Sequence, residues 1–250
     1  MIALITGATA GIGKATATLF AKNGYDIIIT GRRKERLTNF SEELQSTYKV
    51  KVLTLNFDVR NLKEVETAIQ SIPENWKKIN VLVNNAGLAA GLGPIQEGLI
   101  ADWEQMIDTN LKGLLYVTRN IAPTMITNGF GHIINIGSIA GKEVYANGNV
   151  YCATKHAVDA LNKAMRIDLL PHQIKVTAIN PGMVETEFSL VRFKGDEQRA
   201  KKTYEGIDAL TPEDIAETIY WVASRPAHVN INDIIITPTA QANATNTIRK

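Results

Sequence analysis

Tyr151 and Lys155 lie four positions apart in the segment Tyr-Cys-Ala-Thr-Lys. On a helix, this spacing places both side chains on the same face. A free tyrosine has a pKa of about 10, too high for efficient proton transfer near neutral pH, and a neighbouring ammonium group favours the phenolate. The pair could therefore exchange a proton with a bound substrate. An ordinary surface pair would have the same spacing, so other residues must decide.

Two polar residues elsewhere in the chain could complete such a site. Ser138 follows the apolar run His132–Ile136, and its hydroxyl could hold a substrate oxygen beside Tyr151. Asn110 lies in a long helical pattern and could extend a proton path through water to Lys155. Polar residues are common in turns and helices, so neither residue is diagnostic by itself.

A glycine-rich segment, Thr6–Gly13, lies between the first apolar run and the first helical pattern. Gly7, Gly11 and Gly13 would allow a tight turn whose backbone N–H groups approach a pyrophosphate at the helix N-terminus. Glycines also serve ordinary turns, but a position between strand and helix is the context that this motif requires. We therefore expect a dinucleotide cofactor.

The end of the next apolar run indicates which dinucleotide binds. An NAD site usually has an acidic residue at this point, which binds the ribose 2′-hydroxyl. Here the run ends in Thr-Gly-Arg32-Arg33, and Asp26 falls at the opposite end of the run. A guanidinium group matches a phosphate in charge and in geometry. Arg32 and Arg33 therefore favour NADP over NAD, although both could simply be solvated residues that begin the next helix.

Short apolar runs alternate with longer helical patterns along the whole chain. Most runs are rich in isoleucine and valine without polar alternation, as expected of strands buried on both faces. We predict strands at Ile2–Thr6, Asp26–Thr30, Lys51–Asn56, Asn80–Val83, His132–Ile136, Lys175–Asn180 and Asp233–Thr237. We predict helices at Gly13–Asn23, Lys34–Thr47, Asn61–Ser71, Ala101–Thr127, Tyr151–Leu170 and Pro212–Ser224. This alternation predicts an α/β fold in which helices cover both faces of a parallel sheet, as a single domain over residues 1–250.

Polar segments follow two of the predicted strands. Asp58 and Val59 come after the third strand, and Asn84-Asn85-Ala86-Gly87 follows the fourth. Ligands bind at the carboxyl ends of strands in such sheets. Either segment could also be a turn with Asx hydrogen bonding.

The overall composition argues against several classes of protein. With 27 Lys and Arg against 25 Asp and Glu, the net charge of +2 does not suggest nucleic acid or an anionic membrane as a partner. One cysteine, Cys152, cannot form an internal disulfide and fits a reducing compartment, and no apolar segment is long enough to span a bilayer. We therefore expect a cytoplasmic protein. The four histidines lack metal-ligand spacing, so we expect no metal.

Together these motifs resemble the short-chain dehydrogenase/reductase family over essentially the whole chain. Those that match in order and spacing are Thr6-Gly-x-x-x-Gly11-x-Gly13, Asn84-Asn85-Ala86-Gly87, Asn110, Ser138, Tyr151-x-x-x-Lys155 and Pro181-Gly182. The resemblance implies a doubly wound Rossmann-type domain of about seven strands. It also implies a homotetramer built through the helices around residues 101–127 and 151–170.

The resemblance also assigns roles to individual residues. It implies that Tyr151 is the general acid/base, that Ser138 orients the carbonyl and that Asn110 supports a proton relay. Lys155 would bind the nicotinamide ribose and lower the tyrosine pKa. The cofactor-binding residues predicted from the motifs and the resemblance are Gly7, Thr9, Gly11, Ile12, Gly13, Arg32, Arg33, Asp58, Val59, Asn85, Ala86, Gly87, Tyr151, Lys155, Pro181, Gly182, Val184 and Thr186.

A narrower resemblance covers the C-terminal third. Residues 187–196, 209–214 and 226–232 are similar to the NADP-dependent 3-hydroxy acid dehydrogenases, which also oxidise serine and L-allo-threonine. This resemblance implies NADP and a small β-hydroxy acid substrate.

The segment at about 185–206 is long and irregular and is placed where a lid would cover the nicotinamide. It contains Arg192 and Lys194, cations of the kind that a substrate carboxylate needs, although both could face solvent. We expect Ser138, Tyr151 and Arg192 to bind substrate. The glycine-rich loop at residues 88–94 is expected to shape the pocket, and the polar tail at about 238–250 to reach across a subunit interface.

The sequence therefore predicts an NADP-dependent oxidoreductase that acts on small 3-hydroxy acids such as serine, L-allo-threonine and 3-hydroxypropionate, or reduces the corresponding 3-oxo acids and aldehydes. A reductase of another carbonyl, such as a 3-oxoacyl thioester or a diketone, would use the same chemistry with a different pocket. No basic patch for an acidic carrier protein is evident. A non-catalytic NADP-sensing regulator is disfavoured because Ser138, Tyr151 and Lys155 are all present.

Overall fold

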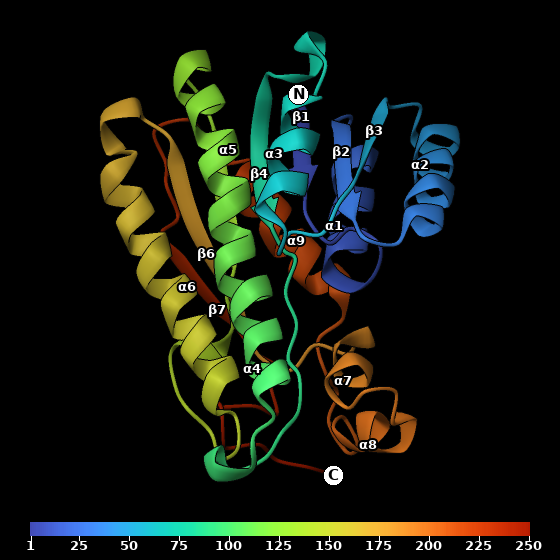
Figure 1. Cartoon of the computed structure of the whole chain (residues 1–250), viewed down its shortest axis with the longest axis vertical. Helices are drawn as coiled ribbons and strands as arrows, with labels where there is room; N and C mark the ends of the chain where they lie inside the picture. The colour runs from blue at the N-terminus through green and yellow to red at the C-terminus, as the bar shows by residue number, and fades with distance from the viewer.

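Seven strands form one parallel sheet in the computed structural model, which describes residues 1–250 (Figure 1). They are β1 (Ile2–Ile5), β2 (Asp26–Gly31), β3 (Val52–Asn56), β4 (Ile79–Asn84), β5 (His132–Ile136), β6 (Lys175–Pro181) and β7 (Asp233–Ile236). Their order is β3-β2-β1-β4-β5-β6-β7. The order reverses between β1 and β4, and ligands bind at such a switch point at the carboxyl edge. The predicted doubly wound Rossmann-type fold is confirmed.

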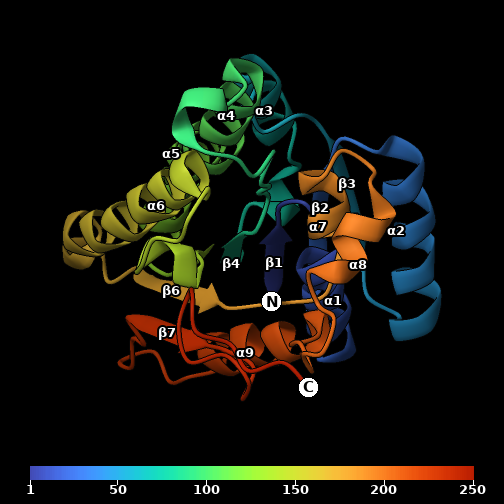
Figure 2. The same cartoon turned by 90° about the horizontal axis from the view of Figure 1, so that it is seen from below.

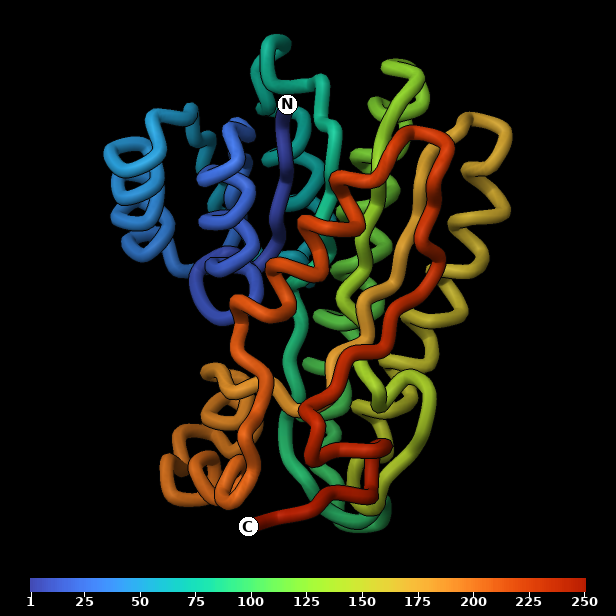
Figure 3. The backbone as a smooth tube through the Cα atoms, turned by 180° about the vertical axis from the view of Figure 1, so that it is seen from behind, coloured from blue at the N-terminus to red at the C-terminus, as the bar shows by residue number.

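Helices cover both faces of this sheet, as Figure 3 shows from behind and Figure 2 from below. The longer helices are α1 (Gly11–Lys22), α2 (Lys34–Tyr48), α3 (Leu62–Gln70), α4 (Ile100–Ile107), α5 (Gly113–Asn128), α6 (Asn149–Asp168) and α9 (Pro212–Ala223). Two shorter ones, α7 (Glu187–Arg192) and α8 (Glu197–Lys202), lie beyond the carboxyl ends of the strands. Short 3₁₀ turns complete the set at η1 (Glu74–Trp76), η2 (Ile95–Glu97), η4 (Ile139–Gly141) and η5 (Leu170–His172).

The hydrophobic core is divided by the sheet into two layers. One packs α1, α2 and α9 on the sheet, with Phe20 and Ile219 fully buried. The other packs α3, α5 and α6 on the opposite face, with Ile121 and Met125 fully buried. The central strands therefore bury side chains on both faces, which explains their unbroken apolar sequences.

The predicted helix Ala101–Thr127 is interrupted in the structure. A π-helical turn, η3 (Asp108–Lys112), separates α4 from α5. The helix is wider at this π-helical turn, where the Asn110 side chain forms hydrogen bonds with the backbone of Leu88. π-Helical turns are frequent at functional sites. Helical periodicity in the sequence does not distinguish this turn from regular α-helix.

The lid differs from the expectation, whereas the reach of the tail across a subunit interface stays a prediction. The segment predicted to be irregular contains α7 and α8, whose N-caps Thr186 and Asp196 each accept a hydrogen bond from a backbone N–H. The tail folds back onto its own chain, because Gln241 Oε1 accepts a hydrogen bond from the Met183 N–H at 2.8 Å. Arg249 likewise donates to carbonyl groups at the end of the lid. None of the helices has both the length and the apolarity needed to cross a bilayer.

Candidate active site

The glycine turn between β1 and α1 is packed too closely for side chains. Gly7 and Gly11 have φ angles of +67° and +51°, which side chains rarely adopt. A Cβ atom at Gly13 would collide with the Gly7 carbonyl oxygen and the Asn85 amide. At the start of α1, Ala10 provides no side-chain cap, and the first turn has no acidic residue. The uncapped amides and the helix dipole therefore fit the pyrophosphate of a dinucleotide.

A cleft of about 630 Å³ is lined both by this turn and by Ser138, Tyr151 and Lys155. The predicted cofactor-binding residues that line it are Gly7, Thr9, Gly11, Ile12, Arg32, Arg33, Asp58, Val59, Asn85, Ala86, Gly87, Tyr151, Lys155, Pro181, Gly182, Val184 and Thr186. Gly13, the remaining member of the set, packs behind the turn. The structure therefore brings segments from six strand ends to one cleft.

The two arginines that follow β2 lie beside the glycine turn. Arg33 donates from Nε and Nη2 to the Thr9 hydroxyl, at 3.1 and 2.8 Å. Its Nη1 forms an ion pair with Glu187 of α7 at 2.9 Å. Arg32 lies 3.8 Å from the Asp58 carboxylate. Two guanidinium groups thus lie at one end of the cleft, and Arg33 is already paired with Thr9 and Glu187.

The catalytic candidates meet on the inner face of α6. Tyr151 and Lys155 are both buried, and the Lys155 ammonium lies 6.0 Å from the centre of the Tyr151 ring. Lys155 Nζ donates to the Ile136 carbonyl at 2.9 Å, which fixes it against the end of β5. Ser138, just beyond the end of β5, lines the same cleft as Tyr151 and Lys155. The sequence-predicted trio therefore converges at the cleft.

Burial sets the protonation of this trio. It raises the pKa of Tyr151 above its ordinary value, and the nearby Tyr145 adds to the rise, whereas Ser138 and Arg192 oppose it. It also lowers the pKa of Lys155 from 10.5 to about 8. For Tyr151 the loss of hydration outweighs the groups that oppose it, and the expectation that Lys155 lowers the tyrosine pKa stays a prediction.

Asn110 lies behind the trio rather than in the cleft. Its Oδ1 accepts a hydrogen bond from the Leu88 N–H, and its Nδ2 donates to the Leu88 carbonyl, both at 2.8 Å. The same Nδ2 donates to the Thr154 hydroxyl at 3.1 Å. This side chain thus ties the loop after β4 to the catalytic helix, and a role in a proton relay stays a prediction.

The lid places one of its two candidate cations beside Tyr151. The Arg192 guanidinium lies 5.6 Å from the ring centres of both Tyr151 and Tyr145, and donates to the Tyr145 hydroxyl at 2.9 Å. Its Nε donates to the Gly91 carbonyl at 3.2 Å. Lys194 instead forms an ion pair with Asp102 at 2.9 Å, away from the cleft.

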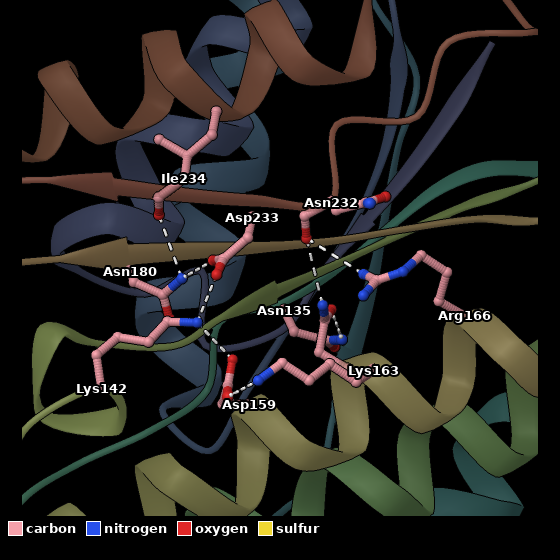
Figure 4. Close-up of polar contacts among 10 residues, drawn as sticks. Asn135, Lys142, Asp159, Lys163, Arg166, Asn180, Asn232, Asp233 and Ile234 are labelled. Carbon is pink, nitrogen blue, oxygen red and sulfur yellow. Dashed lines mark hydrogen bonds and ion pairs between the residues drawn. The ribbon is translucent and has the colours of Figure 1, made fainter.

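A cluster of charged residues braces the catalytic helix against the sheet (Figure 4). Lys142 Nζ lies 2.5 Å from carboxylate oxygens of both Asp159 and Asp233. Asn180, at the end of β6, donates to the Asp233 carboxylate as well. Because Asp159 follows Lys155 by one helical turn, the cluster fixes the part of α6 that carries the ammonium.

Three residues of the site were not predicted from the sequence. Tyr145 lines the cleft and binds Arg192, Phe188 packs edge-on against Tyr151 at 5.6 Å, and Glu187 pairs with Arg33. Tyr145 lies in the loop between Ser138 and Tyr151, which was a weak signal. No group of three or more His, Cys, Asp and Glu side chains is arranged to hold a metal ion.

A family model described as short chain dehydrogenase matches residues 1–196. The chain belongs to the short-chain dehydrogenase family. This short-chain dehydrogenase is 53% identical over 243 residues to the NADP-dependent 3-hydroxy acid dehydrogenase of Salmonella typhi, covering 97% of this chain and 96% of that protein. It is 46% identical over 242 residues to sulfoacetaldehyde reductase 2 of Chromohalobacter salexigens, covering 96% and 95%.

Among solved structures, this short-chain dehydrogenase is similar to the closed form of a serine dehydrogenase complexed with NADP⁺. The TM-score is 0.93 and the identity 47%, and the match covers 100% of both chains. The likeness extends over the lid and the tail as well as the sheet, because no part of either chain is left unmatched.

Proposed function

We propose that this protein is an NADP-dependent dehydrogenase that oxidises the β-hydroxyl of small 3-hydroxy acids, or reduces the corresponding 3-oxo acids. The observation that carries this proposal is Arg192, a guanidinium that the lid holds beside the buried Tyr151. The cofactor follows from Arg32 and Arg33 and from relatives named as NADP-dependent.

The chain's own residues would transfer the proton that accompanies the hydride. When bound, the nicotinamide supplies the hydride for reduction or accepts it during oxidation. Ser138 would donate a hydrogen bond to the substrate oxygen and hold it beside the Tyr151 hydroxyl. Because its pKa is raised, Tyr151 is protonated near neutral pH and suited to protonating a carbonyl oxygen. Oxidation needs the phenolate and should be favoured at higher pH.

Arg192 would bind the acid group of the substrate. A guanidinium pairs with a carboxylate through two parallel hydrogen bonds. The Nη2 of Arg192 is held by the Tyr145 hydroxyl, so the group is oriented before substrate arrives. Phe188 and Tyr151 pack edge-on at this end of the cleft, and an apolar surrounding would strengthen the pairing.

The chemistry of one relative gives this proposal a second candidate substrate. Sulfoacetaldehyde and 3-oxopropionate both carry an anionic group on the carbon next to the aldehyde. A single guanidinium could bind either, and the relative named sulfoacetaldehyde reductase 2 makes the sulfonate worth testing.

Initial rates with NADP⁺ or NAD⁺ test the proposal. We expect turnover of L-serine, L-allo-threonine and 3-hydroxypropionate with NADP⁺, and much less with NAD⁺. Faster reduction of sulfoacetaldehyde than of 3-oxopropionate by NADPH would assign the sulfonate substrate instead. Activity on neutral ketones alone would refute both assignments.

Arg192→Ala tests the role of the guanidinium. It should raise the KM for L-serine about 10- to 100-fold, the range expected for a charge-assisted hydrogen bond, while changing the KM for an uncharged secondary alcohol little. Arg199→Ala is the matched control, since Arg199 is a lid arginine that stacks on Phe193 and does not line the cleft. Equal effects on the acid and the neutral alcohol would refute the assignment.

A homotetramer and a cytoplasmic location also remain part of the proposal. Light scattering coupled to size exclusion would give the mass in solution, which for a tetramer is four times the 27.4 kDa of the chain.

A further inference from the structure

A lid carboxylate lies on the arginines at the cofactor end of the cleft. Glu187, the first residue of α7, places Oε2 at 2.9 Å from Arg33 Nη1 and Oε1 at 2.9 Å from Arg36 Nη1. Thr186, its neighbour, lies 3.3 Å from the position that a Cβ atom on Gly11 would take, which is closer than an ordinary van der Waals contact. The lid thus reaches both the glycine turn and the arginines.

The contacts of Arg33 leave little room for an additional anion. Two of its nitrogens, Nε and Nη2, hold the Thr9 hydroxyl, and the third, Nη1, holds Glu187. Guanidinium recognition of a phosphate uses two neighbouring N–H groups. A phosphate that approaches from the cleft must therefore share or displace one of the two present partners. The hydroxyl is neutral, whereas the carboxylate also repels the phosphate.

We propose that Glu187 is a specificity-determining residue that competes with the 2′-phosphate of NADP for Arg33. The proposal rests on the assignment of Arg33 to that phosphate. When the phosphate binds, Glu187 gives up Arg33 and keeps Arg36, so α7 stays tethered to α2 by one ion pair instead of two. Glu187 therefore weakens the binding of the 2′-phosphorylated nucleotide and leaves the 2′-hydroxyl form unaffected.

The exposure of the three side chains limits the size of this effect. Their exposed fractions are 42% for Arg33, 44% for Glu187 and 52% for Arg36. Ion pairs this exposed contribute little, and loss of the competing carboxylate should change nucleotide affinity about two- to fivefold. A change of that size adjusts selectivity and the release of the nucleotide without abolishing binding.

The direct test is nucleotide binding measured by calorimetry. 2′,5′-ADP carries the 2′-phosphate without the nicotinamide, and 5′-AMP has a 2′-hydroxyl in its place. Glu187→Gln should bind 2′,5′-ADP about two- to fivefold more tightly than the unaltered protein and 5′-AMP equally well. Glu197→Gln removes a lid carboxylate on α8 that does not line the cleft, and should change neither affinity.

Arg33→Ala separates this inference from the assignment on which it rests. It should remove most of the preference for 2′,5′-ADP, and Glu187→Gln should then add nothing. If the unaltered protein binds the two nucleotides equally, the assignment of Arg33 fails and the inference fails with it. If the preference is present but Glu187→Gln leaves it unchanged or reduces it, the inference alone is overturned.

Discussion

Replacing Lys155 by methionine should stabilise the folded protein while removing the ammonium group proposed to act in catalysis. Burial lowers the pKa of Lys155 from 10.5 to about 8. The unfolded chain therefore binds the proton first as the pH falls from 10.5 towards 8, and the native state loses stability over that range. At pH values below the folded pKa, Lys155 is charged in both states, and its buried charge lowers the free energy of unfolding by about 3 kcal/mol. This value takes ~1.4 kcal/mol for each unit of pKa difference.

The methionine variant avoids this cost but loses one interaction. The hydrogen bond from Lys155 to the Ile136 carbonyl is worth about 1 kcal/mol, so the net gain at about pH 7 should be about 2 kcal/mol. At about pH 9.5 the charging cost has fallen by about 2 kcal/mol, and the variant should match the unaltered protein.

Urea denaturation of the nucleotide-free proteins at these two pH values measures the difference in the free energy of unfolding between Lys155→Met and the unaltered protein. Lys142→Met is the control of opposite sign, because two carboxylates raise the pKa of Lys142 and its contribution is lost only at higher pH. That variant should be less stable than the unaltered protein at both pH values. A gain for Lys155→Met that does not change with pH would refute the argument from burial.

Two further predictions concern the elements that carry the site. Gly13→Ala places a Cβ atom against the Gly7 carbonyl oxygen, so it should lower the Tm by about 5 °C and weaken NADP⁺ binding in calorimetry. Gly93→Ala, where a Cβ atom meets open space, should do neither, and equal Tm values for the two variants would contradict the steric argument. Thr211→Ala removes the capping box with Asp214 and should cost about 1 kcal/mol, seen as a fall in Tm of about 2–4 °C by scanning calorimetry. An unchanged Tm would mean that Asp214 caps α9 alone.

The sheet and the cofactor turn could be predicted because their signals are local. β2 was predicted as Asp26–Thr30 and ends one residue later, at Gly31. Buried parallel strands leave continuous apolar runs, and the turn after β1 needs glycine for steric reasons. The family resemblance predicted that Tyr151 and Ser138 act in the same site, which the residues alone did not decide.

The features that escaped prediction depend on residues far apart in the chain. The ion pair between Arg33 and Glu187 joins positions separated by 154 residues. Arg192 and Tyr145 are separated by 47. The pKa of Lys155 depends on its burial, which helix spacing does not reveal. Such contacts are products of the tertiary fold, so local sequence patterns carry little information about them.

Cys152, the chain's one cysteine, is buried next to Tyr151 in a small apolar cluster. A maleimide dye should therefore react poorly with the unaltered protein. A thiol introduced on the exposed face of α8 by Glu197→Cys would be the main site of labelling, with no natural thiol to remove first. The lid could thus carry a fluorophore that reports its position on a stopped-flow timescale as nucleotide and substrate bind.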